Sequence, residues 1–168
     1  MNITAGKYKG QKITAPDESI TRPTLSKVRM AVFNTLQSLI DFEGASFLDM
    51  FAGSGIMGLE ALSRGFKKVT AIEKNTKIFK ILEENYKKIG ENQTLIKGDC
   101  LKNIPQESFD VVYIDPPYYA GVYEQALSVL SKCKIIILEH TIEINFADFK
   151  IIKQKKYGNK YLTFIQKA

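Results

Sequence analysis

The sequence predicts an α/β fold in which a mostly parallel sheet carries helices on both faces. The main observation is that short β-rich runs alternate with amphipathic helical patterns along the chain. The length of 168 residues fits one domain, and 45% hydrophobic with 25% charged residues is ordinary globular composition. The longest aliphatic run, Ile135 to Leu138, is far shorter than the roughly 20 apolar residues that cross a bilayer. We therefore expect a single domain over residues 1–168 that does not enter a membrane.

Five β-rich runs form the expected parallel core, and three helices connect them. The runs are Phe47 to Phe51, Lys68 to Glu73, Thr94 to Asp99, Phe109 to Ile114 and Lys134 to Glu139. The helices are expected over Gly55 to Arg64, Asn75 to Ile89 and Tyr123 to Leu130. Strands that are joined by helices lie parallel, because each helix carries the chain back to the edge where the strands begin.

The two ends of the chain depart from this alternation. A helix is expected from Thr24 to Ile40, with Thr24 as its N-cap, and residues 3–15 predict a short exposed hairpin or arm. At the other end, two strand-like runs flank a hairpin signal; these are Phe149 to Lys155, Lys160 to Gln166 and Tyr157-Gly158-Asn159. We therefore divide the domain into an arm and helix over 1–45 and a sheet core over 46–168, with the hairpin at one edge of the sheet.

Basic residues gather at both ends of the chain. The net charge is +6; residues 1–34 hold six basic and two acidic residues, and residues 147–168 hold six and one. The slightly acidic middle between two basic ends suits a protein that holds a polyanion while its centre acts on an uncharged group. Cys100 and Cys133 lack metal-ligand or C-x-x-C spacing, so we expect reduced thiols, no metal site and a cytoplasmic protein.

A glycine-rich turn follows the first core strand. Gly53, Gly55 and Gly58 satisfy the G-x-G-x-x-G pattern at the entry to a helix, and Glu73 ends the next strand. Glycine lets a ligand approach the backbone closely, and the helix N-terminus offers free N–H groups to an anion. This logic serves a dinucleotide pyrophosphate and an amino-acid carboxylate equally well, so an NAD-dependent dehydrogenase stays open at this point.

Three successive strands end in an acidic residue. These residues are Asp49, Glu73 and Asp99, and the carboxyl ends of neighbouring parallel strands line the crevice where α/β sheets bind ligands. A row of carboxylates repels a diphosphate but attracts a cation. S-adenosyl-L-methionine, which carries a sulfonium, an ammonium and ribose hydroxyls, therefore fits the row better than a nicotinamide dinucleotide.

The motif Asp115-Pro116-Pro117-Tyr118 directly follows the fourth core strand. The two prolines remove two N–H donors and hold the chain extended, which leaves the Asp115 side chain and the Pro116 carbonyl as acceptors. Two fixed acceptors can grip both hydrogens of an amine on a nucleobase and aim its nitrogen at a methyl group. Tyr118 offers a face on which an extruded base can stack.

These motifs resemble those of class I S-adenosylmethionine-dependent methyltransferases that modify amino nitrogens. The resemblance is closest to the bacterial family that makes N2-methylguanine in 16S ribosomal RNA. It rests further on Ala5-Gly6-Lys7-Tyr8-Lys9-Gly10, Thr21-Arg22-Pro23-Thr24, Val28-Arg29, Phe33-Asn34 and Gly58 to Gly65. It implies a Rossmann-like class I methyltransferase fold with a seven-stranded sheet, and a substrate within the small ribosomal subunit or its assembly intermediate. We expect the protein to be a monomer.

The resemblance also implies roles for individual residues. The expected cofactor contacts are Asp49, Phe51, Ala52, Gly53, Ser54, Gly55, Glu73, Lys74, Asp99, Cys100 and Asp115, and the expected catalytic residues are Asp115, Pro116, Pro117 and Tyr118. Phosphate contacts are expected, in line with the charge map, from Lys7, Lys9, Lys12, Arg22 and Arg29. His140 is expected to be structural, since a sulfonium methyl donor needs no strong base.

Other functions remain open from the residues alone. An N6-adenine DNA methyltransferase would grip its target amine in the same way, and a glutamine-modifying protein methyltransferase is a further candidate. From another class, the chain can be a non-catalytic nucleotide-binding or RNA-binding module. The lysines of the C-terminal hairpin fit either an extension of the RNA track or an edge strand protected against aggregation.

Overall fold

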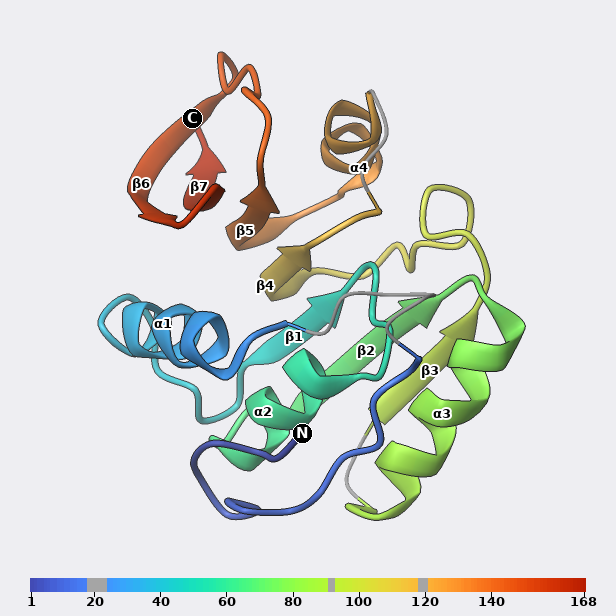
Figure 1. Cartoon of the computed structure of the whole chain (residues 1–168). Coiled ribbons are helices and arrows are strands. Elements are labelled where there is room, and N and C mark those ends of the chain that lie inside the picture. The colour runs from blue at the N-terminus through green and yellow to red at the C-terminus, as the bar shows by residue number, and fades with distance from the viewer. Residues whose placement is uncertain (18–23, 91–92, 118–120) are drawn as a thin grey trace.

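The computed structural model describes residues 1–17, 24–90, 93–117 and 121–168, and these residues build one seven-stranded sheet (Figure 1). The strand order is β3-β2-β1-β4-β5-β7-β6. The prediction of a mostly parallel sheet with helices on both faces and an antiparallel C-terminal hairpin is confirmed.

Five neighbouring strands of the sheet, from the edge strand β3 to β5, are parallel. They are β1 (Ser46–Asp49), β2 (Lys68–Glu73), β3 (Gln93–Lys97), β4 (Phe109–Ile114) and β5 (Cys133–His140). Strand β1 pairs with both β2 and β4, so the chain changes direction across the sheet at this point. Such a switch point leaves a crevice at the carboxyl ends of the strands, where α/β proteins bind their ligands.

Helices cover both faces of the sheet. The helices α1 (Ser26–Gln37), α2 (Ile56–Ser63) and α3 (Thr76–Lys87) share one hydrophobic cluster with the sheet, and α4 (Val122–Val129) belongs to a second cluster. The sheet residues alternate between the two clusters: Phe47 and Tyr113 lie in the first, Leu48 and Ile114 in the second. This period of two places the side chain of Asp49 on the face of α1, α2 and α3.

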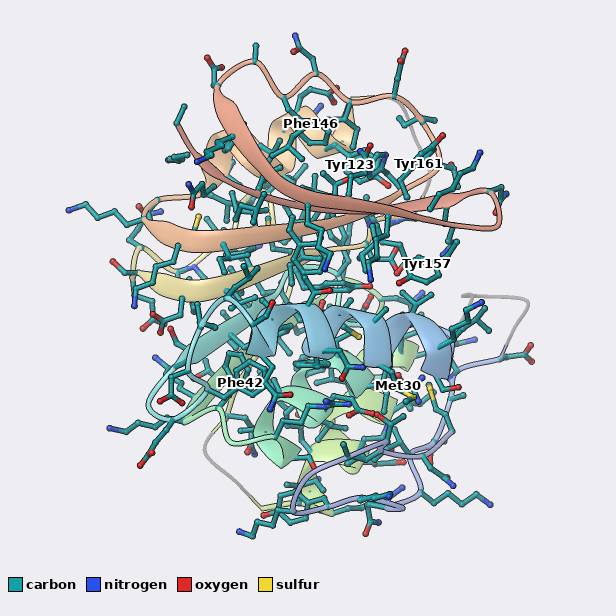
Figure 2. The ribbon with its side chains drawn as sticks, turned by 90° about the vertical axis from the view of Figure 1, so that its left-hand side faces the viewer. Met30, Phe42, Tyr123, Phe146, Tyr157 and Tyr161 are labelled. Atoms are coloured by element: carbon teal, nitrogen blue, oxygen red, sulfur yellow. The ribbon has the colours of Figure 1, made fainter. Side chains whose placement is uncertain are left out.

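The two C-terminal strands extend the sheet in the antiparallel sense. Strand β7 (Lys160–Lys167) pairs with β5, and β6 (Phe149–Tyr157) forms the outer edge, with a register shift between Ile151 and Lys153. His140, at the end of β5, is 3% exposed and is hydrogen-bonded to Ile142 and Thr163. Its ring contacts the rings of Tyr123, Phe146 and Tyr161, which lie close together in Figure 2. Burial lowers the pKa of His140, and these contacts agree with the expected structural role.

The N-terminal arm comprises residues 1–17. The sequence predicts an exposed hairpin or arm over residues 3–15, and this expectation is wrong for its apolar residues. Asn2 and Lys12 form an antiparallel bridge, as in a hairpin, but Ile3 and Ile13 are each 1% exposed and belong to the core of the first face. The arm passes between α2 and α3 on its way to the carboxyl edge of the sheet (Figure 1). Its basic side chains are therefore carried on a backbone that is fixed to the domain.

Helix α1 is shorter at its N-terminus than the sequence predicts. The N-cap position is held by Leu25, which makes no side-chain capping bond, and Thr24 lies one residue before it. The Thr24 carbonyl instead accepts a hydrogen bond from the Arg29 guanidinium at 2.6 Å. A side chain of α1 therefore provides the hydrogen-bond partner of the backbone carbonyl just before the helix. None of the helices within the described ranges is long and apolar enough to span a membrane.

Candidate active site

The glycine-rich turn between β1 and α2 contains glycines of two kinds. Gly53 has a φ of 56°, and a Cβ built on it would meet open space. A Cβ on Gly55 would come within 2.5 Å of the Tyr86 ring, and one on Gly58 within 2.1 Å of the Tyr86 hydroxyl. Gly55 and Gly58 are therefore required by packing against α3, and only Gly53 leaves free space beside the turn for a ligand.

Asp49 ends β1 directly beneath this turn. Its side chain is 1% exposed, Phe51 donates a backbone hydrogen bond to the carboxylate, and Oδ1 has no hydrogen-bond partner among the described residues. Burial, and after it the charge of Glu73, raises the pKa of Asp49 to about 7. A buried carboxylate with a free oxygen gains most from a cationic or hydrogen-bond-donating partner.

Glu73 is the last residue of β2, and Asp99 lies two residues after the end of β3. Glu73 accepts hydrogen bonds from the backbone N–H groups of Gly53 at 2.9 Å and Asn75 at 2.7 Å, which ties the end of β2 to the glycine turn. Asp99 accepts from the Leu101 N–H and is ion-paired with Lys74 at 3.2 Å. The Leu101 hydrogen bond and Lys74 hold the pKa of Asp99 below its ordinary value. Both carboxylates are partly exposed and can accept further hydrogen bonds.

The remaining predicted cofactor contacts differ in their access to the crevice. Ala52 and Ser54 are 6% and 5% exposed, and Phe51 is partly buried. Cys100 is 4% exposed within the second hydrophobic cluster, and burial raises the pKa of its thiol to about 12. Cys100 is therefore a neutral apolar neighbour of the crevice rather than a nucleophile.

Asp115 follows the end of β4 on the same face of the sheet as Asp49. The register pairs Asp49 with Tyr113, two residues before Asp115, so both carboxylates point to the side of α1, α2 and α3. Burial raises the pKa of Asp115 well above its ordinary range, the carboxylates of Glu139 and Asp49 raise it further, and Lys160 lowers it. Within the described ranges, the Asp115 carboxylate has no hydrogen-bond or ion-pair partner, so it is available to a ligand.

The two prolines after Asp115 differ in exposure. Pro116 is buried and Pro117 is exposed. The predicted stacking residue, Tyr118, lies outside the described residues.

The residues at this edge fit S-adenosylmethionine. The unpartnered Oδ1 of Asp49 and the open space beside Gly53 give a carboxylate and an approachable backbone at one point. Glu73 and Asp99 supply acceptors for hydroxyl and amino groups on the neighbouring strands. A dinucleotide would place its diphosphate against a buried carboxylate, which opposes its binding.

The sequence matches a known protein family over nearly its whole length. A family profile described as "Conserved hypothetical protein 95" covers residues 1–166. The chain belongs to this family. Its relatives include the ribosomal RNA small subunit methyltransferase D proteins of Haemophilus influenzae and Escherichia coli K12. The former is 36% identical over 77% of this chain and 70% of the relative, the latter 33% identical over 77% and 66%.

Solved structures agree with this membership. The Escherichia coli protein yhhF superposes with a TM-score of 0.87 at 26% identity and covers all of this chain and 98% of its own. A hypothetical protein from Thermus thermophilus superposes with a TM-score of 0.85 at 26% identity, over 99% of both chains. The structure has the class I methyltransferase fold, and the chain is a methyltransferase of the small subunit methyltransferase D family. This fold implies S-adenosylmethionine as the methyl donor.

The predicted phosphate contacts of this family member divide into three groups. Lys7, Lys9 and Lys12 are exposed on the arm. Arg22 lies outside the described residues. The prediction for Arg29 is wrong in this structure, because its side chain is 2% exposed, ion-paired with Glu60 at 3.5 Å and hydrogen-bonded to the Asn2 carbonyl at 2.9 Å.

The structure also brings together residues that the sequence did not reveal. Glu139, 2% exposed at the end of β5, accepts a hydrogen bond from the Tyr113 hydroxyl at 2.6 Å and is ion-paired with Lys160 of β7. The Tyr123 hydroxyl donates to the Glu139 carbonyl at 2.7 Å. Of this group, Glu139 and Lys160 are the charged residues that act on Asp115. The sequence did contain a signal for Glu139: this residue ends the predicted strand that follows the Asp115-Pro116-Pro117-Tyr118 motif in the chain.

Proposed function

We propose that this methyltransferase modifies the exocyclic N2 amine of a guanine in small-subunit (16S) ribosomal RNA. The observation that carries the proposal is the placement of Asp115, unpartnered among the described residues, at the carboxyl edge of the sheet, beside the crevice formed by Asp49, Gly53 and Glu73. The small subunit methyltransferase D proteins among its relatives support ribosomal RNA as the substrate.

The cofactor half of the site would be built by the ends of three strands. Asp49, Glu73 and Asp99 would accept hydrogen bonds from the polar groups of S-adenosylmethionine, and the backbone at Gly53 would contact its methionine part. The cofactor supplies a methyl group that is already activated by a positively charged sulfur. The chain therefore needs to bind and orient the two reactants rather than to activate a nucleophile strongly.

The acceptor half would be built by Asp115 and the Pro116 carbonyl. These oxygens would each accept one N–H of the guanine amine and turn its nitrogen towards the methyl group. When the nitrogen gains a carbon bond it must lose a proton, and the Asp115 carboxylate can take this proton or pass it to water. The raised pKa of Asp115 favours its role as the first acceptor of the proton.

The arm would carry the RNA side of the interaction. Lys7, Lys9 and Lys12 are exposed on a backbone that is fixed to α2 and α3, so they present positive charge without the freedom of a loose tail. The C-terminal lysines of β6 form a second exposed basic group on the outer edge of the sheet. We take the arm as the principal phosphate contact of a single methyltransferase domain.

The test is transfer of labelled methyl groups to small ribosomal subunits from cells that lack this gene. We expect label in one guanine of 16S ribosomal RNA, identified as N2-methylguanine after digestion, and no label in subunits from wild-type cells. Subunits that accept no label would refute the ribosomal substrate. Label in N6-methyladenine of DNA, or in a glutamine of a protein, would support the two alternative methyltransferase activities instead.

A further inference from the structure

The carboxamide of Asn85, on the inner face of α3, contacts both the N-terminal arm and the glycine turn. Asn85 is fully buried. Its Oδ1 accepts from the Thr14 N–H at 2.9 Å, and its Nδ2 donates to the carbonyls of Thr14 and Ser54, each at 2.9 Å. Lys88 Nζ also donates to Oδ1, at 3.4 Å. Both amide hydrogens are thus used, and the Thr14 N–H fixes which side of the carboxamide carries the oxygen.

The two partners of Asn85 belong to different halves of the proposed site. Ser54 lies between Gly53 and Gly55 in the turn that would meet the cofactor. Thr14 lies two residues after Lys12 in the arm, which passes between α2 and α3 (Figure 1). One buried side chain therefore joins the backbone of the RNA-facing arm to the backbone of the cofactor turn.

The other hydrogen bonds of the arm go to α1, to α2 and to Lys88, and among the described residues none of them reaches the glycine turn. Arg29 donates to the Asn2 carbonyl at 2.9 Å, and Lys88 donates to the Thr14 hydroxyl at 3.3 Å. Ser63 accepts from the Tyr8 N–H at 2.9 Å and donates to the Ala5 carbonyl at 2.6 Å, and Glu60 accepts from the Thr4 N–H at 2.6 Å. These bonds hold the arm to the domain without touching the turn. Asn85 differs because loss of order at Thr14 would take the Thr14 N–H from its Oδ1 and the Thr14 carbonyl from one Nδ2 hydrogen, and would loosen the bond to Ser54 at the same time.

We propose that Asn85 is a positioning residue that couples RNA binding on the arm to S-adenosylmethionine binding at the glycine turn. The inference rests on the proposed function, since it assigns RNA to the arm. A ligand that orders the arm also holds the Asn85 carboxamide, and thereby the Ser54 carbonyl and the turn. The second ligand then meets a turn that is already ordered, and linkage requires the effect to be equal in both directions.

The direct test measures the affinity for labelled S-adenosylhomocysteine by equilibrium dialysis, with and without saturating 16S ribosomal RNA transcribed in vitro. We expect RNA to tighten binding by about fivefold or more in the wild-type protein. In Asn85→Ala, the ratio of the affinities measured with and without RNA should fall to about one. Ser63→Ala, which loses two arm hydrogen bonds but no contact with the turn, is the matched control and should keep the wild-type ratio within about twofold.

A second measurement needs no variant and no RNA. Hydrogen exchange is followed in the wild-type arm, residues 1–17, before and after addition of S-adenosylhomocysteine. We expect slower exchange around Thr14 when the cofactor product is bound. Unchanged exchange in the arm, or an Asn85→Ala protein with the wild-type affinity ratio, would overturn the coupling.

The outcomes separate this inference from the proposed function. Methylation of 16S ribosomal RNA without any coupling refutes the inference and leaves the function standing. Slower exchange in the arm without methylation of ribosomal RNA refutes the substrate and supports the connection through Asn85. A protein that binds no S-adenosylhomocysteine at all would overturn both.

Discussion

The hydroxyl of Tyr86 lies directly beneath Gly58, and a Cβ at position 58 would come within 2.1 Å of the phenolic oxygen. Tyr86 is fully buried, and its hydroxyl has no hydrogen-bond partner among the described residues. The last glycine of the G-x-G-x-x-G pattern therefore exists to let α2 approach α3. The pattern looks like a dinucleotide fingerprint in the sequence, but this glycine serves packing.

Gly58→Ala is expected to destabilise the protein by about 1–3 kcal/mol, because the added methyl group overpacks a filled interior. Tyr86→Phe removes a buried unpaired hydroxyl and should stabilise the protein by about 1 kcal/mol. In the background of Tyr86→Phe, the loss of stability caused by Gly58→Ala should be smaller by about 0.5 kcal/mol or more, because the Tyr86 hydroxyl that the new methyl group would meet is gone. Urea unfolding of the four proteins measures the cycle; strictly additive effects would contradict the proposed packing.

The architecture and most of the crevice follow from the sequence because they depend on local signals. A few consecutive residues are enough to recognise an acidic residue at the end of a strand, as at Asp49, Glu73 and Asp99. The same holds for the helical spacing of apolar residues such as Ile78 and Leu82. The strand boundaries of β2 and β4 were predicted correctly for this reason. Asn75 caps α3 through its own side chain, a signal that also lies within one turn.

Contacts between distant segments could not be predicted in the same way. Arg29 lies among basic residues in the sequence, yet its partner Glu60 comes from another helix, so its burial was missed. Thr14 and Asn85 are 71 positions apart. No local pattern distinguishes a buried asparagine that joins two segments from one that caps a helix or faces solvent.

Asp49 is expected to make cofactor binding depend on pH. With a pKa of about 7, the carboxylate is mostly protonated at pH 6 and mostly charged at pH 8. The affinity for the positively charged S-adenosylmethionine should therefore rise with pH through this range. Asp49→Asn should lose this dependence and bind about tenfold more weakly at pH 8. Calorimetry at both pH values measures it, with Asp110→Asn as a control, because Asp110 lies at the start of β4 and is paired with Lys134.

The same residue should affect folding in the opposite sense. The folded pKa lies above the ordinary value of 3.8, so between about pH 4 and pH 7 the folded protein binds more protons than the unfolded chain. The stability that Asp49 contributes is complete below pH 4 and is lost as the pH rises through 7. Without cofactor, the stability of Asp49→Asn relative to wild type should rise by about 2–3 kcal/mol between pH 5 and pH 8. A difference that stays constant with pH would contradict the raised pKa.

Asp115 is expected to contribute much more to methyl transfer than to cofactor binding, although it is also among the expected cofactor contacts. Asp115→Ala should lower single-turnover transfer by about a hundredfold or more, because an acceptor that orients the amine is lost. The affinity for S-adenosylhomocysteine should stay within about threefold of wild type. Asp148→Asn, at an exposed position before β6, is the control and should retain full activity. Near-normal transfer by Asp115→Ala would remove Asp115 from the chemistry.

The charges next to Asp115 are expected to set the pH at which transfer begins. Glu139 raises the pKa of Asp115, whereas Lys160, which is ion-paired with Glu139, lowers it. Transfer requires the charged form of Asp115, so the rate should rise with pH. Lys160→Met should move this rise to higher pH, and Glu139→Gln should move it to lower pH. The measurement is the single-turnover rate of each variant as a function of pH, and the two profiles should shift in opposite directions. A structural defect alone would lower both rates but would not shift the pH at which each rate rises.

The lysines of the arm should account for part of the salt dependence of RNA binding. Each phosphate contact with single-stranded RNA contributes about 0.7 to the slope of log affinity against log salt concentration. Replacing Lys7, Lys9 and Lys12 with glutamine should therefore reduce the slope by about 2, while the fold is kept because these side chains are exposed. The matched variant replaces Lys153, Lys155 and Lys156 of β6. An unchanged slope in the arm variant, with a reduced slope in the β6 variant, would show that the phosphate contacts are made by the lysines of β6 and not by those of the arm.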